Sequence, residues 1–132
     1  METKGRLALA AAGLPRPELQ VELHGTRGFV ARVDAWFDDA AVAVEFDGKV
    51  KYTDPRNGRD AGEVLWREKR REDAVRDLGV RFVRIAQEDL APARRGEWTE
   101  RIRSLLAGPP SGPRRFTVVR TPEPGAPLGD AA

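Results

Sequence analysis

The sequence predicts an α/β fold in which helices flank one mixed β-sheet. Segments that alternate apolar and polar residues, as strands do, are interspersed with segments of helix-like composition. Their order along the chain is helix, three strands, helix, strand, helix, which gives a mixed sheet of about four strands. At about 150 residues per domain, the 132 residues form one domain rather than two.

The first part of the chain combines one helix with three consecutive strands. Residues 3–12 are rich in Ala and Leu and are followed by Gly13, which predicts a helix that stops there. Three segments then alternate apolar with polar side chains, as strands with one buried face do: residues 18–24, 29–37 and 41–47. Asp38 and Asp39 form the turn between the last two strands, so the three strands make an antiparallel meander.

The second part of the chain alternates helix and strand. Residues 48–59 are rich in loop-forming residues, and residues 60–78 form a long helix that stops at Gly79. Residues 80–85 form one more strand, and residues 97–107 form one more helix with an apolar side. The tryptophans have apolar neighbours within predicted elements, so we expect them in the core or at an interface rather than stacked on bases: Trp36, Trp66 and Trp98.

The last 25 residues have the composition of a disordered tail. They hold six of the ten prolines and four of the thirteen glycines. Residues 116–120 (FTVVR) are β-prone and could dock as an edge strand, but the surrounding composition leads us to expect that they stay loose. The expected division is a globular domain at residues 1–107 and a Pro- and Gly-rich tail at residues 108–132.

Composition excludes several classes of chemistry. The chain has no Cys and a single His, His24, which excludes thiol nucleophiles and argues against a Ser-His-Asp triad or a His-rich metal site. The formal charge of +2 does not signal a nucleic-acid-binding protein, so any basic patch must be local. No apolar run approaches the roughly 20 residues of a membrane helix, and residues 1–12 do not resemble a signal peptide. We therefore expect a cytoplasmic protein without membrane contacts.

Acidic residues of the second and third strands are predicted to gather on one face of the sheet. If Phe37 and Val42 close the hairpin, Asp34 lies opposite Glu45, and directly opposed residues share a face. Asp47 lies two residues further along the same face. Three like charges at close range repel one another unless a positive charge lies among them. Oxygen ligands without Cys or a His cluster favour Mg²⁺ or Mn²⁺ over Zn²⁺.

Lys49 and Lys51 follow the last of these acids. An ammonium group there could orient a water, help to deprotonate it or stabilise charge on a phosphate. The alternative is that the acids form the solvated face of an edge hairpin and that the lysines are ordinary surface charges. That alternative predicts that Asp34→Ala is neutral or stabilising, because repulsion among the acids is relieved.

The long helix carries charged residues within its apolar stripe. At 3.6-residue spacing the inward stripe consists of Val64, Glu68, Arg71, Val75 and Leu78. In one interpretation Arg71 binds a phosphate, or Glu68 and Arg71 together support the carboxylates that hold the metal. In the other, Glu68 and Arg71 form an ion pair with each other at i, i+3 spacing. Arg67 and Arg70 belong to a positive margin that could follow a nucleic-acid backbone, or to a plain solvated helix face.

Four motifs within residues 2–90 occur in an order that resembles a known family. They are GLPRPELQVEL, RVDAWF, VEFDGKVKY and LWREKRREDAVRDLGVRFVRI. Together they resemble a domain-of-unknown-function family related to very-short-patch-repair (Vsr-like) endonucleases, in the PD-(D/E)XK superfamily. The resemblance implies a restriction-endonuclease-like α/β/α sandwich and a Mg²⁺-dependent phosphodiesterase that cuts DNA. It also implies that longer members carry an N-terminal winged-helix segment similar to abortive-infection antitoxins.

The resemblance also assigns roles to individual residues. Asp34 matches the metal-binding strand aspartate, and Glu45 and Asp47 match an E-x-D-G motif. The superfamily signature acid-x-Lys fits only from Asp47 to Lys49, so the principal metal ligand is Glu45 or Asp47. The catalytic lysine is Lys49 or Lys51, the latter standing where many relatives have a histidine. Further matches are an acid on the first helix, a glutamine on the first strand, and acidic and basic positions on the long helix: Glu2, Gln20, Glu68, Arg71 and Glu72.

Two functions of different class follow from these residues. The first is an endonuclease in which Mg²⁺ or Mn²⁺ is held by acids that include Asp34 and Glu45, and basic residues contact DNA phosphates. The second is a catalytically inactive nuclease-fold module that acts through DNA or protein contacts in a defence or toxin–antitoxin system. Metal binding distinguishes them, because an inactive module need not bind Mg²⁺ at Asp34. The oligomeric state and the form of the DNA substrate stay open.

Overall fold

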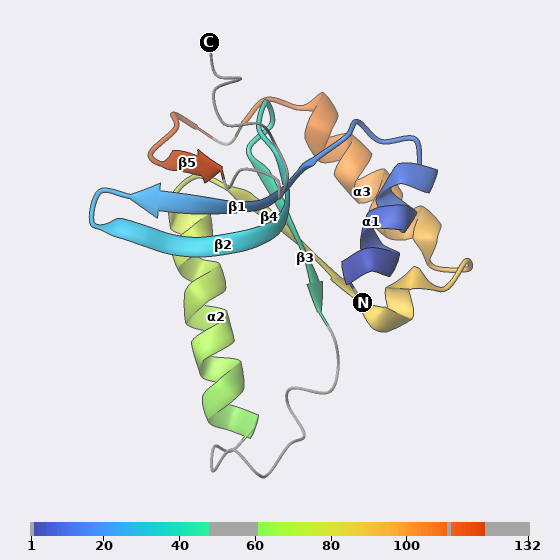
Figure 1. Ribbon diagram of the computed structural model, residues 1–132, viewed down its shortest axis with the longest axis horizontal. Helices are drawn as coiled ribbons and strands as arrows, with labels where there is room; N and C mark the ends of the chain where they lie inside the picture. Colours follow the sequence, from blue (N-terminus) through green and yellow to red (C-terminus); the bar gives the residue numbers. More distant parts are fainter. Residues whose placement is uncertain (1, 48–60, 111, 121–132) are drawn as a thin grey trace, which may run out of the picture.

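The computed structural model describes residues 2–47, 61–110 and 112–120. Its elements follow the expected order of helix, three strands, helix, strand and helix, with a further strand at the end (Figure 1). None of the described helices is long and apolar enough to cross a membrane. The elements are α1 (Glu2–Ala11), β1 (Glu18–Gly25), β2 (Gly28–Phe37), β3 (Val42–Asp47), α2 (Ala61–Asp77), β4 (Arg81–Ala86), the short 3-10 helix η3 (Gln87–Leu90), α3 (Arg95–Ala107) and β5 (Thr117–Arg120).

The described strands form one mixed sheet in the order β4-β3-β2-β1-β5. The β1–β2, β2–β3 and β1–β5 pairs are antiparallel, which confirms the predicted meander, and β3 pairs with β4 in parallel. The α/β class and the mixed sheet are therefore as expected. The sheet has five strands rather than about four.

The fifth strand corrects the prediction for residues 116–120, which are docked and not loose. Residues 117–120 pair with residues 21–24 of β1. Phe116 is only 8% exposed, and its ring packs edge-on against Trp36 with 5.5 Å between the ring centroids. A β-prone run next to a large aromatic residue can bury enough apolar surface to overcome the flexible composition around it. The predicted tail beyond residue 120 lies outside the described residues.

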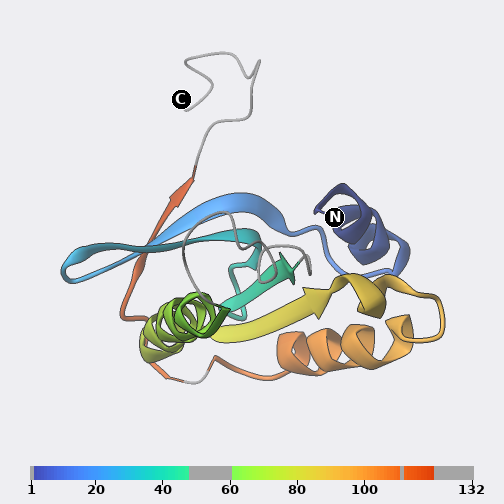
Figure 2. The ribbon, with the colours of Figure 1, turned by 90° about the horizontal axis from the view of Figure 1, so that it is seen from below.

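Two apolar clusters form the core, on the two faces of β3. Val44 packs with residues of α1 and α3, whereas its neighbour Ala43 packs with Val75 of α2 and Phe82 of β4. This division follows from the alternation of side chains along a strand. In both views α2 lies at the opposite end of the molecule from α1 and α3 (Figures 1 and 2).

The β1–β2 hairpin changes faces at Gln20. Leu19 packs in the cluster with α1 and α3, but Val21, two residues on, packs in the cluster with α2. Gln20 between them has a positive φ of 53°, which is uncommon for a residue with a side chain. The register of β1 with β2 places Gln20 opposite Asp34, so the hairpin bends at a predicted site residue.

The helix α1 approaches β3 closely at Gly5. Gly5 of α1 is buried against the ring of Phe46, and a Cβ atom built at Gly5 would lie 2.8 Å from Cγ of Phe46 and closer still to its ring edge. Real Cβ atoms do not approach a ring so closely. The absence of a side chain at Gly5 therefore allows α1 to pack directly on β3.

We expect Gly5→Ala to destabilise the protein by about 1–2 kcal/mol, because overpacking outweighs the gain in helix propensity. Urea unfolding followed by circular dichroism measures this change. The matched control is Gly96→Ala in α3, where a Cβ would meet nothing within 4 Å. Equal stability of the two variants would show that Phe46 can move aside.

Candidate functional site: a charged cluster between the sheet and α2

The face of the sheet that packs on α2 is apolar at one end and charged at the other. The apolar end contains Ala43, Val75 and Phe82. The charged end, here called the charged cluster, is built from β2, β3, β4 and α2. It consists of Asp34, Glu45, Asp47, Glu68, Arg71, Glu72 and Arg84.

Asp34 and Glu45 adjoin the last paired residues of β2 and β3. The β2–β3 ladder pairs Phe37 with Val42 and Ala35 with Val44, which is the register that the sequence predicts, and continuing it by one step would place Asp34 opposite Glu45. This pairing follows from the length of the hairpin connection, which fixes the register.

Two hydrogen bonds hold the Asp34 carboxylate. Its Oδ2 accepts the main-chain N–H of Phe46 at 2.9 Å, and its Oδ1 accepts Nε2 of Gln20 at 3.2 Å. The prediction assigned Gln20 to substrate binding, and in the structure its side chain contacts a predicted metal ligand. Asp34 is thus fixed from both neighbouring strands.

Arg71 supplies positive charge within the cluster. Its guanidinium donates to the Glu45 carboxylate and, at 2.8 Å, to the main-chain oxygen of Arg32. The hydrogen bond to Glu45 raises the pKa of Arg71, burial opposes this, and the charges of Glu45, Glu68 and Asp34 raise it further. Arg71 therefore forms an ion pair with Glu45 of β3. The sequence had left open whether Arg71 would pair with Glu68, three residues earlier on the same helix.

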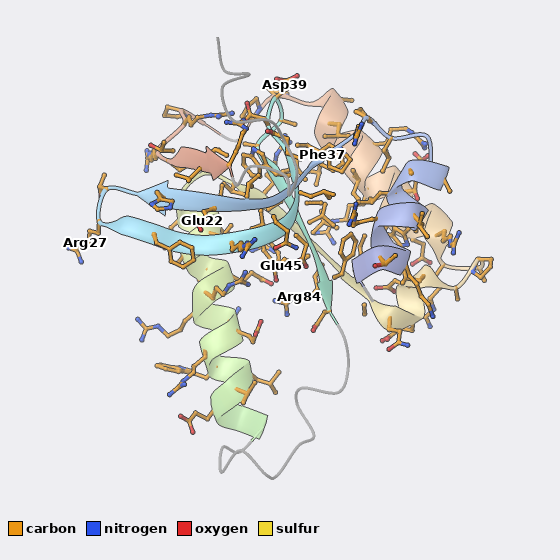
Figure 3. All side chains as sticks on the ribbon, viewed as in Figure 1. Glu22, Arg27, Phe37, Asp39, Glu45 and Arg84 are labelled. Carbon is orange, nitrogen blue, oxygen red and sulfur yellow. The ribbon has the colours of Figure 1, made fainter. Side chains whose placement is uncertain are left out.

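Arg84 of β4 is a member of the cluster that sequence reasoning missed. Its guanidinium lies 3.8 Å from Asp47, 3.5 Å from Glu68 and 3.6 Å from Glu72, so it bridges β3 to two successive turns of α2. Arg84 is the parallel partner of Glu45, and Figure 3 shows the two side by side. The alternation of the strand RFVRI, which puts residues 82 and 84 on the same face, was the available signal.

The remaining basic residues predicted to bind substrate lie on the exposed side of α2. Arg67 pairs with Glu63 at 3.0 Å, and the Arg70 guanidinium lies 4.9 Å from the centre of the Trp66 ring. Trp66 is 59% exposed, which contradicts a core position for it. Trp36 and Trp98 are buried, as predicted.

Three predicted site residues cannot be placed. Lys49 and Lys51 lie outside the described residues. Glu2 is the first residue of α1, and its side chain is not described. Within residues 2–47, 61–110 and 112–120, no three His, Asp or Glu side chains are grouped closely enough to hold a metal ion. Four carboxylates of the cluster instead face guanidinium groups: those of Glu45, Asp47, Glu68 and Glu72.

The chain is similar to two proteins of Mycobacterium tuberculosis, named Uncharacterized protein MT2308 (strain CDC 1551 / Oshkosh) and Uncharacterized protein Rv2248 (strain ATCC 25618 / H37Rv). It is 34% identical to each over 90 residues, which is 68% of this chain and 31% of each relative. The chain therefore spans less than a third of the length of these relatives. No protein-family model and no solved structure matches it. The names of the relatives describe no activity, so a functional argument rests on the charged cluster.

Proposed function

We propose that the protein is a metal-dependent endonuclease that hydrolyses DNA phosphodiester bonds in the cytoplasm, on a restriction-endonuclease-like α/β/α sandwich. The observation that carries this proposal is that Asp34 of β2 and Glu45 of β3 both lie close enough to Arg71 for their charges to act on it, with Asp47 further along β3. Carboxylates on adjacent strands of one sheet face, half-buried beneath a helix, provide fixed oxygen ligands for a cation.

The chemistry of the cluster suits a hard divalent cation. The cluster has more carboxylates than guanidinium groups, so its charge is negative even with both arginines in place. Asp34, Glu45 and Asp47, with Glu2 as a further acid, would hold Mg²⁺ or Mn²⁺. Such an ion supplies positive charge to a phosphodiester and favours deprotonation of the attacking water.

Basic residues of this chain complete the proposed site. Lys49 or Lys51 would orient the water whose oxygen attacks phosphorus, while the leaving sugar oxygen takes up a proton. Arg71, Arg67 and Arg70 on α2 would contact phosphates of the DNA backbone.

A second candidate is an inactive nuclease-fold module that binds DNA or a protein partner in a defence or toxin–antitoxin system. One observation favours it: Arg71 and Arg84 already provide counter-charges for the acids. A module of this kind would keep the cluster for stability alone.

Thermal unfolding and DNA cleavage together test the proposal. We expect millimolar Mg²⁺ or Mn²⁺ to raise the melting temperature by several degrees, since binding at about ten times Kd adds roughly 1.4 kcal/mol. The same cations should support nicking of supercoiled plasmid or cleavage of single-stranded circular DNA, and excess EDTA should stop it. Stabilisation without cleavage of either DNA would favour the inactive module, and the absence of both effects would rule out a metal-dependent nuclease.

A further inference from the structure

A pocket lies between α1 and α3, on the other face of the sheet from the charged cluster. Ala8 of α1 and Ile102 of α3 pack in the core on that face, and beside them the two helices form a pocket of about 290 Å³. Its volume is near the lower end for small-molecule sites, so it suits a small ligand. The lining is apolar on α1 and polar on α3: Ala8, Ala11, Ala12, Arg95, Gly96, Thr99, Glu100 and Arg103.

The beginning of α3 brings hydrogen-bond donors to this pocket. Arg95 is the first residue of the helix, so the N–H groups of Arg95 and Gly96 have no carbonyl partner within it, and no side chain caps them from Arg94. The aligned peptide dipoles of the 13-residue helix add partial positive charge at this end. Arg95 donates through Nε to the main-chain oxygen of Leu90 at 2.8 Å, and its two terminal nitrogens have no partner within the described residues.

Thr99 adds a buried hydroxyl one turn further along the same face of α3. It is 9% exposed and is the one buried polar residue in the described part of the chain. Its hydroxyl has no hydrogen-bond partner among those residues, yet it is not one of the polar atoms sealed from solvent, so it is reached through the pocket that Thr99 lines. A buried hydroxyl without a partner costs free energy, and a ligand oxygen in the pocket would remove that cost.

The carboxylate in the pocket lining already has a counter-charge. Glu100 accepts a hydrogen bond from Arg103, which also donates to the main-chain oxygen of Ala12 at 3.2 Å. The lining is therefore positive through Arg95. Its donors without partners suit an anion with several acceptor oxygens, and the alanines of α1 suit an apolar group attached to that anion.

We propose that this pocket binds the phosphate group of a small phosphate monoester. Arg95, Thr99 and the first N–H groups of α3 donate to the phosphate, and the organic part packs on Ala8, Ala11 and Ala12. A phosphate monoester offers three acceptor oxygens and about two negative charges, which suit a guanidinium and a helix N-terminus better than a singly charged carboxylate does. This inference goes beyond the proposed function, because the pocket shares no residue with the charged cluster and needs no cation.

Heteronuclear NMR titration of the full chain tests the proposal at matched ionic strength and neutral pH. The probes are ethyl phosphate, inorganic phosphate, dimethyl phosphate and acetate. We expect saturable shifts of the Arg95, Gly96 and Thr99 N–H signals, with ethyl phosphate binding at least about threefold more tightly than inorganic phosphate because its ethyl group is buried. Dimethyl phosphate, which represents the singly charged diester of a nucleic-acid backbone, and acetate should each bind at least about fivefold more weakly than ethyl phosphate.

Single substitutions on α3 test the donors. Arg95→Gln should weaken ethyl phosphate binding at least about tenfold, because a charge-assisted hydrogen bond is lost. Thr99→Val keeps the shape of the side chain and should weaken binding about threefold to tenfold without lowering the melting temperature, whereas Thr99→Ser should stay within about threefold of the wild type. Arg101→Gln is the matched control, since it removes an exposed charge of the same helix outside the pocket lining and should leave the affinity unchanged.

Each other result overturns the proposal. Absence of saturable shifts at Arg95, Gly96 and Thr99 means that the pocket binds no phosphate, and wild-type affinity in both Arg95→Gln and Thr99→Val means that phosphate binds elsewhere. Acetate or dimethyl phosphate binding as tightly as ethyl phosphate excludes selection of a monoester. Binding of inorganic phosphate without ethyl phosphate excludes an organic ligand. The nuclease proposal is unaffected by any of these results.

Discussion

Asp34→Asn should lower cation-dependent DNA cleavage by at least about 100-fold, the loss typical of removing a group that stabilises charge at a reaction centre. Asparagine keeps an oxygen that can accept the N–H of Phe46, and the Gln20 amide can rotate to face the new NH₂ group. The fold is thus retained while the negative charge is lost. Initial rates of plasmid nicking in Mg²⁺ measure the effect, and the stabilisation by Mg²⁺ should decrease in parallel.

Asp39→Asn is the matched control for this experiment. Asp39 is exposed in the turn of the same hairpin, at the far end from Glu45 (Figure 3), and it belongs to no part of the charged cluster. Its replacement should leave both cleavage and the Mg²⁺ effect unchanged. Wild-type rates for Asp34→Asn would show that any cleavage arises elsewhere and would remove the basis of the proposed site.

Trp36→Ala should destabilise the protein by about 3–5 kcal/mol, the usual cost of truncating a buried aromatic side chain. Trp36 is fully buried, its indole N–H donates to Asp38 at 2.9 Å, and its ring packs edge-on against Phe116 of the C-terminal segment. Such a loss is a large part of the 5–15 kcal/mol that stabilises an ordinary domain. Urea unfolding followed by far-ultraviolet circular dichroism measures it.

Trp66→Ala makes the same chemical change at an exposed position of α2 and should alter stability by less than about 0.5 kcal/mol. The pair therefore separates burial from residue type. A large effect at Trp66 would mean that residues outside the described part of the chain pack on it.

The register of the acids could be predicted because it depends on local sequence. Alternation marks the strands, and the short connection between Phe37 and Val42 leaves one pairing that keeps the apolar residues together. The inward stripe of α2 was predicted for a similar reason, and Glu68, Arg71 and Val75 are all at least partly buried. The same stripe places Trp66 on the other side of the helix, although its apolar neighbours suggested the core.

Contacts between distant segments could not be predicted in this way. The place of Arg84 depends on the parallel register of β4 with β3, which a long helical crossover separates. The change of faces at Gln20 needs a backbone conformation that no local signal for a glutamine indicates. The docking of residues 117–120 depends on the open edge of β1 and on the apolar surface around Trp36, and the composition of the segment itself indicated flexibility.

The pairing of β5 with β1 also bears on how the protein is made. Arg120 donates a hydrogen bond to Glu18, which lies 102 positions earlier in the sequence. During synthesis β1 therefore emerges from the ribosome long before residues 117–120, with which it pairs. During that interval one edge of β1 has no strand beside it, and an open edge is a template for pairing with other chains. The contacts between β1 and β5 are also among the slowest to form, because closing a long loop delays folding. The newly synthesised chain therefore carries an open edge of β1 until residues 117–120 emerge and pair with it.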